Sequence, residues 1–143
     1  MVRIEAVNEA TSEVLNALTK LLPQLNPTLP LPTMERLQAI ISDPAVTILL
    51  ARNANEIVGT VTVIVYTTPF WIKARLDEVV VDESVRGKGV GAALVKASLD
   101  LAREKGAEIV ELQSAVHREE ANRLYPRLGF KLRETNVYRI VLG

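Results

Sequence analysis

Apolar and polar positions in the first third of the chain follow two different periods. Residues 2–7 (VRIEAV) alternate apolar and polar side chains, which predicts a strand with one buried face. Apolar residues then recur at helical spacing over 14–22 and again over 34–41, which predicts two helices. Four prolines lie between these stretches and predict an extended loop, and Thr33 is placed to cap the second helix.

The next part of the chain is rich in β-branched residues. Residues 46–51 (VTILLA) and 57–66 (IVGTVTVIVY) are separated by a polar stretch at 52–56 that is typical of a turn. The two stretches therefore predict an antiparallel hairpin. Gly59 interrupts the second strand, where it suggests a bulge.

The second half of the chain continues this succession of strands and helices. Val90, Leu94, Ala97 and Leu101 form one helical stripe, and Gly106 should end that helix. The other predicted elements are strands over 76–81, 109–113, 130–132 and 137–142 and a short helix over 118–127 that Pro126 interrupts near its end. The predicted order is β-α-α-β-β-β-α-β-α-β-β. It indicates a mixed α/β (α+β) layer architecture in a single domain over residues 1–143.

Composition and charge exclude several classes of function. Lys plus Arg equals Asp plus Glu at 17 each, so no nucleic-acid partner is expected. The absence of cysteine and the single histidine exclude disulfides, thiolate sites and a cysteine nucleophile, and no metal is expected. No apolar run is long enough for a membrane span, and the N-terminus lacks an apolar signal core, so a cytoplasmic location is expected.

The segment 79–95 (VVVDESVRGKGVGAALV) carries the main candidate chemistry. A buried strand leads into a glycine-rich loop, and the loop opens a helix. The first amides of a helix are unpaired and lie at the positive end of its dipole. With Arg86 and Lys88 beside them, they predict a site for an anion such as pyrophosphate. The alternative is a loop whose glycines serve only to turn the chain.

Two familiar nucleotide-binding motifs fit this loop less well. A P-loop needs a Gly-Lys-Ser/Thr sequence that is missing here. Residues 87–92 satisfy the Rossmann pattern G-x-G-x-x-G/A, and Glu111 follows about 20 residues later. However, five residues separate Val81 from Gly87, and only 32 residues follow Glu111, too few for the further βα units of that fold.

Two motifs together resemble the GNAT superfamily of acyl-CoA N-acyltransferases. Arg86-x-x-Gly89-x-Gly91 resembles the family signature R-x-x-G-x-G/A. A second family motif is matched by Ala121-x-x-Leu124-Tyr125-x-x-x-Gly129-Phe130. The resemblance extends over nearly all 143 residues. It implies the GNAT fold, a central mixed, mostly antiparallel sheet flanked by helices, with acetyl-CoA as cosubstrate.

The resemblance also implies where acetyl-CoA lies. In the family, the strand before the loop splays from the next parallel strand, here 76–81 from 109–113, and the pantetheine arm occupies the gap. Backbone groups of Val79 and Val81 would hold that arm, and an amide near Val80 would stabilise the oxyanion of the tetrahedral intermediate. The pyrophosphate would bind at Arg86, Gly87, Lys88, Gly89, Val90, Gly91 and Ala92.

The same resemblance supplies two candidate catalytic residues. Glu78 is the candidate base that takes a proton from the acceptor amine, the alternative being a surface carboxylate. Asp77, Asp82 and Glu83 are weaker candidates. Tyr125 matches the tyrosine that protonates the departing CoA thiolate in many members, the alternative being a core aromatic.

One stretch of the chain departs from the common family pattern. Many members carry an asparagine where this chain has Arg118, which leaves open how the helix over 118–127 contacts the cosubstrate. With Val116, Arg118 also gives a weak similarity to aminoalkylphosphonate acetyltransferases. The lone His117 could join a substrate site or cap the end of strand 109–113.

The expected function is transfer of an acetyl group from acetyl-CoA to a primary amine of a small molecule. Two alternatives stay open: acetylation of a protein or peptide, and an idle acyl-CoA-binding module. The acceptor pocket is expected from residues 22–33, the loop 66–75 with Phe70 and Trp71, and the C-terminal strands. The expected partners are the amine and acetyl-CoA, with neither nucleic acid nor membrane, and a homodimer is left open.

Overall fold

The computed structural model describes residues 2–143, which form two compact units. The first unit ends at Gln113, and the second runs from Ser114 to Gly143. The prediction of a single domain stays a prediction, and each unit is described in turn.

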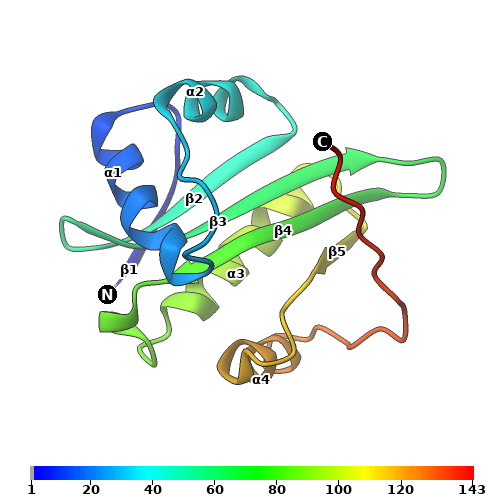
Figure 1. The fold of residues 1–143 in the computed structure, drawn as a ribbon. Coiled ribbons are helices and arrows are strands. Elements are labelled where there is room, and N and C mark those ends of the chain that lie inside the picture. The colour runs from blue at the N-terminus through cyan, green and yellow to red at the C-terminus, as the bar shows by residue number, and fades with distance from the viewer. Residues whose placement is uncertain (1) are drawn as a thin grey trace. The chain divides into compact units, whose positions relative to one another are not determined.

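The first unit is built on a five-stranded sheet in the order β1-β2-β3-β4-β5 (Figure 1). Neighbouring strands are antiparallel from β1 to β4, and β4 and β5 are parallel. The strands are β1 Val2–Ala6, β2 Val46–Asn53, β3 Glu56–Thr67, β4 Ile72–Val81 and β5 Ile109–Leu112. The predicted class, a mixed and mostly antiparallel sheet with flanking helices, is confirmed. Strand β4 begins four residues earlier than predicted.

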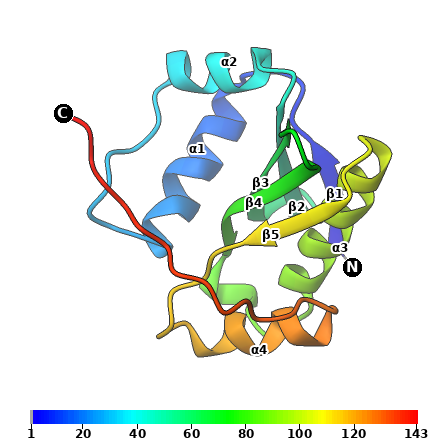
Figure 2. The same ribbon diagram turned by 90° about the vertical axis from the view of Figure 1, so that its right-hand side faces the viewer.

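Helices cover both faces of this sheet. Figure 2 shows α1 (Ser12–Leu21) and α2 (Met34–Ser42) on one face and α3 (Val90–Glu104) on the other. The hydroxyl of Thr33 accepts a hydrogen bond from the amide of Arg36 at 3.1 Å, so Thr33 caps α2 as predicted. Leu21 and Leu37 are fully buried in the layer between these two helices and the sheet, and this apolar layer holds both helices on the sheet.

On the opposite face, Gly59 determines how closely α3 packs. A Cβ atom at this position would lie 2.9 Å from Cδ1 of Leu94 and 3.2 Å from Cγ1 of Val90. Because Gly59 lacks that atom, the first turns of α3 lie directly on β3. The β2–β3 register also shifts beside it, from Ala51 opposite Gly59 to Arg52 opposite Ile57, so the expected irregularity is present.

The second unit contains α4 (Glu119–Arg127) followed by a segment without regular structure. The strands predicted over 130–132 and 137–142 are wrong. A strand requires hydrogen bonds to a neighbour, and within the described residues the backbone of 131–143 makes none. The apolar side chains of this segment are exposed, Leu132 at 100% and Tyr138 at 88%. The predicted interruption at Pro126 is also wrong, because α4 continues to Arg127 and the amide of Leu128 still reaches the carbonyl of Tyr125 at 3.1 Å.

Candidate active site

The central feature of the site is a change in strand pairing within β4. The parallel pairing with β5 ends at Leu76, which lies opposite Leu112. Residues 77–81 continue β4 with β3 on one side and, within the described residues, no strand on the other. Beyond Leu76, the edge of β4 that faces β5 is therefore free. This edge includes Val79, Val80 and Val81, the residues expected from the resemblance to hold the pantetheine arm.

A β-bulge lies at the start of this free edge. Thr62 pairs with Asp77 and Thr60 with Val80, so Val61 alone faces both Glu78 and Val79. Glu78 has φ 54°, a left-handed conformation that is strained for a residue with a side chain. A bulge re-aims the side chain that it carries, and bulges are frequent beside active sites.

The chain after β4 turns into α3 through the glycine loop. Gly87 has φ 80° and Gly89 has φ 82°, and a Cβ at either position would meet no atom within 4 Å. Hydrogen bonding within α3 begins only with the amide of Ala93, which reaches the carbonyl of Gly89 at 3.0 Å. Within residues 2–143, the amides of 87–92 donate to no protein atom. The loop is thus an open run of free donors at a helix start, the arrangement that binds phosphate oxygens.

Two cationic side chains flank this run of amides. Arg86 and Lys88 are both exposed. The guanidinium Nε of Arg86 donates to the carbonyl of Val81 at 3.2 Å, which holds the base of the side chain against the end of β4. The carbonyl of Val81, one of the backbone groups predicted to bind pantetheine, therefore already accepts a hydrogen bond from within the protein.

The beginning of the loop is tied to the segment that follows α1. Asp82 is buried, with Lys20 Nζ at 3.0 Å, and it accepts the amide of Ser84 at 3.1 Å. These two donors, the Ser84 amide first, lower the pKa of Asp82. Gln24, in the short helix η1 (Leu22–Gln24), accepts the amide of Glu83 at 2.9 Å. Asp82 and Glu83 therefore position the loop, and sequence reasoning did not find Lys20 or Gln24.

Glu78 and Asp77 are neighbours with opposite surroundings. The carboxylate of Asp77 pairs with Arg75 at 2.9 Å. Glu78 is exposed as a residue and forms no hydrogen bond or ion pair with any residue in 2–143. Partial desolvation of its carboxyl, followed by the negative charge of Asp77, raises the pKa of Glu78 above its usual range. A raised pKa brings a carboxyl closer to the range in which a general base works, and the Glu78 carboxylate, unlike that of Asp77, is held by no ion pair among residues 2–143.

A cavity of about 470 Å³ borders Glu78 on the sheet face that carries α1 and α2. Most of its lining is leucine, proline and isoleucine side chains: Leu18, Leu22, Pro23, Leu25, Leu29, Pro30, Leu31, Pro32, Ile40 and Ile48. The polar lining residues are Asn26, Thr33, Thr60 and Thr62, and the charged ones are Arg36 and Glu78. The volume lies in the range of small-molecule sites. The loop 66–75 contributes no lining residue, and Phe70 is 87% exposed.

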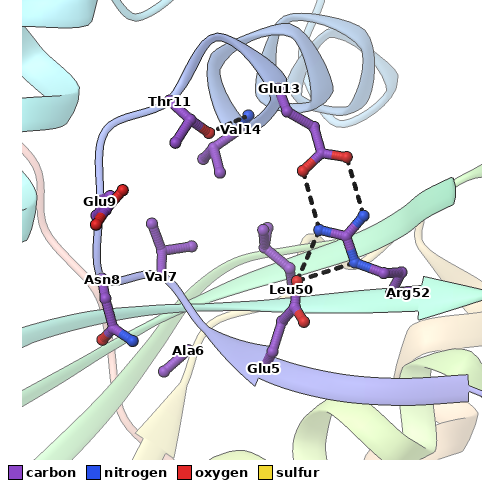
Figure 3. Close-up of a pocket in the computed structure, with 10 residues that line it drawn as sticks. All are labelled: Glu5, Ala6, Val7, Asn8, Glu9, Thr11, Glu13, Val14, Leu50 and Arg52. Carbon is purple, nitrogen blue, oxygen red and sulfur yellow. Dashed lines mark hydrogen bonds and ion pairs between the residues drawn. The ribbon is translucent and has the colours of Figure 1, made fainter. Parts of the chain in front are cut away.

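A second hollow, of about 300 Å³, lies on the same unit between β1 and the start of α1 (Figure 3). Arg52 enters it and is bound by two carboxylates, Glu5 at 2.7 Å and Glu13 at 3.0 Å. Hydrogen bonds to Glu13 and then to Glu5 raise the pKa of Arg52 further above its usual value. Arg52 is therefore paired within the protein, whereas Glu9, which also lines the hollow, forms no ion pair among residues 2–143.

Tyr125 lies in the second unit, on α4. It is 6% exposed, and its ring contacts Phe130 edge to face with 5.8 Å between the centroids. Burial raises the pKa of Tyr125, and the positive charge of Arg118 opposes that shift. Its role stays a prediction. His117 is exposed in the turn before α4, beyond the end of β5.

The chain was compared with models of known protein families. A family model described as the acetyltransferase (GNAT) family matches residues 12–130. This match covers most of the chain, including the glycine loop and Tyr125.

The chain belongs to the GNAT acetyltransferase family. The match leaves out β1 and the irregular C-terminal residues 131–143. No helix among residues 2–143 of this GNAT chain is long and apolar enough to cross a membrane.

Individual relatives agree with the family assignment. The chain is 39% identical over 61 residues to an uncharacterised N-acetyltransferase of Methanocaldococcus jannaschii, covering 43% of this chain and 27% of that protein. It is 33% identical over 96 residues to an aminoalkylphosphonate N-acetyltransferase of Salmonella typhimurium, covering 65% and 62%. The chain thus spans less than two thirds of the length of either relative.

A solved structure extends the likeness to the whole fold. An aminoglycoside acetyltransferase from an uncultured soil metagenomic sample, in complex with trehalose, superposes with a TM-score of 0.87. The superposition covers 99% of this chain and 96% of that one at 23% identity, which shows a shared fold.

Proposed function

We propose that the protein is an acetyl-CoA-dependent N-acetyltransferase that acts on a primary amine of a small molecule. The observation that carries this proposal is the run of free amides at residues 87–92 beside the free edge of β4. The first feature suits a pyrophosphate and the second suits an extended pantetheine arm. GNAT acetyltransferases use acetyl-CoA, which supplies an acetyl group activated as a thioester.

The binding residues follow from these two features. The amides of 87–92, with Arg86 and Lys88, would hold the pyrophosphate by charge-assisted hydrogen bonds. Backbone groups of Val79 and Val81 would pair with the pantetheine arm along the edge of β4. The Arg86 side chain leaves the carbonyl of Val81 only one remaining lone pair for this purpose.

The transfer itself needs a neutral amine and a stabilised oxyanion. Glu78 would accept the proton of the acceptor ammonium, directly or through water, which frees the nitrogen lone pair for attack on the thioester carbon. A backbone amide near Val80 would donate to the carbonyl oxygen as negative charge develops there. When the new C–N bond forms and the C–S bond breaks, the hydroxyl of Tyr125 would protonate the departing thiolate.

Two observations support a small acceptor. The cavity beside Glu78 has the volume of a small-molecule site. The Salmonella relative is named for acetylation of aminoalkylphosphonates, which are small amines. Acetylation of a peptide amine is the competing outcome, and a cytoplasmic location is part of the proposal.

The test combines binding with turnover. Calorimetry should show direct binding of acetyl-CoA, and an assay for free thiol should show CoA release with members of a panel of polyamines, amino acids, aminophosphonates, aminoglycosides and peptides. Absence of acetyl-CoA binding would overturn the assignment, and binding without release from any amine would favour the idle binding module. Release with peptides alone would move the acceptor to the peptide class.

The role of Tyr125 is tested separately. Tyr125→Phe should lower kcat by roughly 10²–10⁴-fold and leave the Kd for acetyl-CoA unchanged, because the hydroxyl is used only when the thiolate departs. An unchanged single-turnover rate would assign that proton to another group.

A further inference from the structure

The cavity beside Glu78 carries information about the acceptor that the family assignment lacks. Its wall is mainly leucine, isoleucine and proline, and part of this apolar surface is open to solvent, with Leu29 at 62% and Leu31 at 47% exposed. A ligand that covered these side chains would remove apolar surface from water, which favours binding. The wall therefore selects for a hydrocarbon body.

Most polar oxygens on the wall are already engaged within the protein. The hydroxyl of Thr33 accepts the amide of Arg36, and the hydroxyl of Thr60 donates to the carbonyl of Leu49 at 3.2 Å. The side-chain oxygen of Asn26 accepts the amide of Thr28 at 3.0 Å. A sugar-like ligand with many hydroxyls would find few partners here and would bury its polar groups unpaired.

The two charged side chains on the wall, unlike most of the polar oxygens, have no partner in the part of the chain that the structure describes. Among residues 2–143, neither the guanidinium of Arg36 nor the carboxylate of Glu78 forms an ion pair or a side-chain hydrogen bond. They come from different elements, Arg36 from α2 and Glu78 from the bulge in β4. The cavity thus presents a cation and an anion that the protein itself leaves without partners.

From this arrangement we propose that the acceptor is a primary amine with an apolar body and an anionic group, a carboxylate or a phosphonate, at the end remote from the amine. The amine would lie at Glu78 and the anion at Arg36, whose planar guanidinium binds such oxygens in pairs. The inference rests on the proposed function, because only acetyl transfer requires the amine at Glu78.

An amine without an anion would leave Arg36 without a partner in the complex. An amine with a second cation would place like charges together and bind less well. The proposal therefore predicts a ranking among amines of equal length: anionic first, neutral next, dicationic last.

The experiment uses three matched series of increasing chain length: ω-amino carboxylates, simple alkylamines and α,ω-diamines. The wild-type kcat/KM, measured by CoA release, should be highest for the ω-amino carboxylates by roughly tenfold to a hundredfold, the effect of a charge-assisted contact. Arg36→Leu should remove this preference, mainly by raising KM for the carboxylates, and should leave the alkylamines unaffected or improved. Lys96→Gln, at an exposed cation on α3, is the matched control and should keep the wild-type ranking.

A second readout does not depend on turnover. Hexanoate, which has the anion and the apolar body without the amine, should inhibit in competition with the amine, and Arg36→Leu should weaken that inhibition. Equal kcat/KM for the charged and neutral series, or a ranking unchanged by Arg36→Leu, would overturn the proposed acceptor while leaving acetyl transfer intact. Failure of acetyl transfer itself would appear as no CoA release with any series.

Discussion

The two hollows of the first unit use similar charged residues in opposite ways. In the hollow beside β1, Arg52 meets Glu5 and Glu13 at distances of 2.7 and 3.0 Å (Figure 3). In the cavity beside β4, Arg36 and Glu78 both line the wall, and among residues 2–143 neither side chain forms an ion pair. Paired charges leave little for a ligand to gain, whereas unpaired charges gain most from an oppositely charged ligand.

The backbone conformation also differs between Arg52 and Glu78. Arg52 lies on β2 next to a register shift. Glu78 lies in a bulge with a positive φ, so the protein accepts strain to place a carboxylate that it does not pair. The comparison predicts that changes at Arg52 act on stability and that changes at Glu78 act on turnover.

The largest expected effect is that of Glu78→Gln on turnover. Glutamine keeps the shape but cannot take the proton, so kcat/KM should fall by roughly 10²–10⁴-fold. Wild-type activity should decline as the pH falls through the raised pKa of Glu78, because only the ionised form is a base, and the variant should lack that limb. Both enzymes must be compared with the same amine, since amine ionisation produces a similar limb. Asp77→Asn, beside it but paired with Arg75, is the matched control and should lose far less activity.

The next effect concerns acetyl-CoA binding at the start of α3. Arg86→Ala should weaken the Kd by roughly tenfold to a hundredfold, because it removes a charge-assisted contact to pyrophosphate. Gly89→Val should weaken it further, since a β-branched residue resists φ 82°. Arg103→Ala, at the other end of α3, controls for the loss of one cation. Unchanged affinity in a folded Arg86→Ala variant would remove the pyrophosphate site from this loop.

A smaller effect is expected from Arg52→Leu, and it should appear in stability. Loss of Arg52 leaves Glu5 and Glu13 without their shared cation, which should lower the free energy of unfolding modestly because Glu13 is largely exposed. Arg52 lowers the pKa of Glu13, so its contribution is present above the unfolded pKa of Glu13 and is lost as pH falls through the folded one. The variant should accordingly show a flatter loss of stability in acid by denaturant titration. A fall in kcat/KM in folded Arg52→Leu would break the comparison, since it would make this hollow part of the active site.

The smallest effect tests the strain at Glu78. Glycine should be more stable than alanine at this position by about 1 kcal/mol, because only glycine adopts a positive φ without a Cβ clash. At an ordinary strand position the order is reversed. Denaturant titration of Glu78→Gly and Glu78→Ala measures the difference, and an alanine variant that is the more stable would show that the bulge stores no strain.

Much of the fold could be predicted from sequence because its signals are local. Periodicity located α1, α2 and α3, and the cap at Thr33 was readable from its position before an apolar stripe. Strand β4 was predicted too short because Lys73 and Arg75 make its first residues look polar. Those side chains pair with Glu111 and Asp77, and such partners are visible only in three dimensions. At the C-terminus the pattern indicated strands, but residues 131–143 lack the partner that a strand needs.

The site divides in the same way. The glycine loop and Glu78 could be proposed from the sequence because a motif marks the loop and the resemblance marks the strand. The ties from Lys20 to Asp82 and from Gln24 to Glu83 join residues about 60 positions apart, and neither sequence stretch has a pattern that announces them. Arg36 has the pattern of an ordinary surface helix residue, and only the structure shows that it lines the same cavity as Glu78.

The contact at Gly59 has a consequence for how the protein tolerates sequence change. Gly87 and Gly89 are constrained by torsion, since the space around them is open and only the backbone angle excludes other residues. Gly59 is constrained by volume, because a single methyl group there would press on the side chains of Leu94 and Val90 in α3 and on the carbonyl of Val80. Val90 lies in the turn that carries several of the free amides, so a substitution on the sheet would act on the proposed anion site without touching it. A larger residue at position 59 should therefore be tolerated only with smaller residues at positions 90 and 94, so the three positions should change together in related sequences.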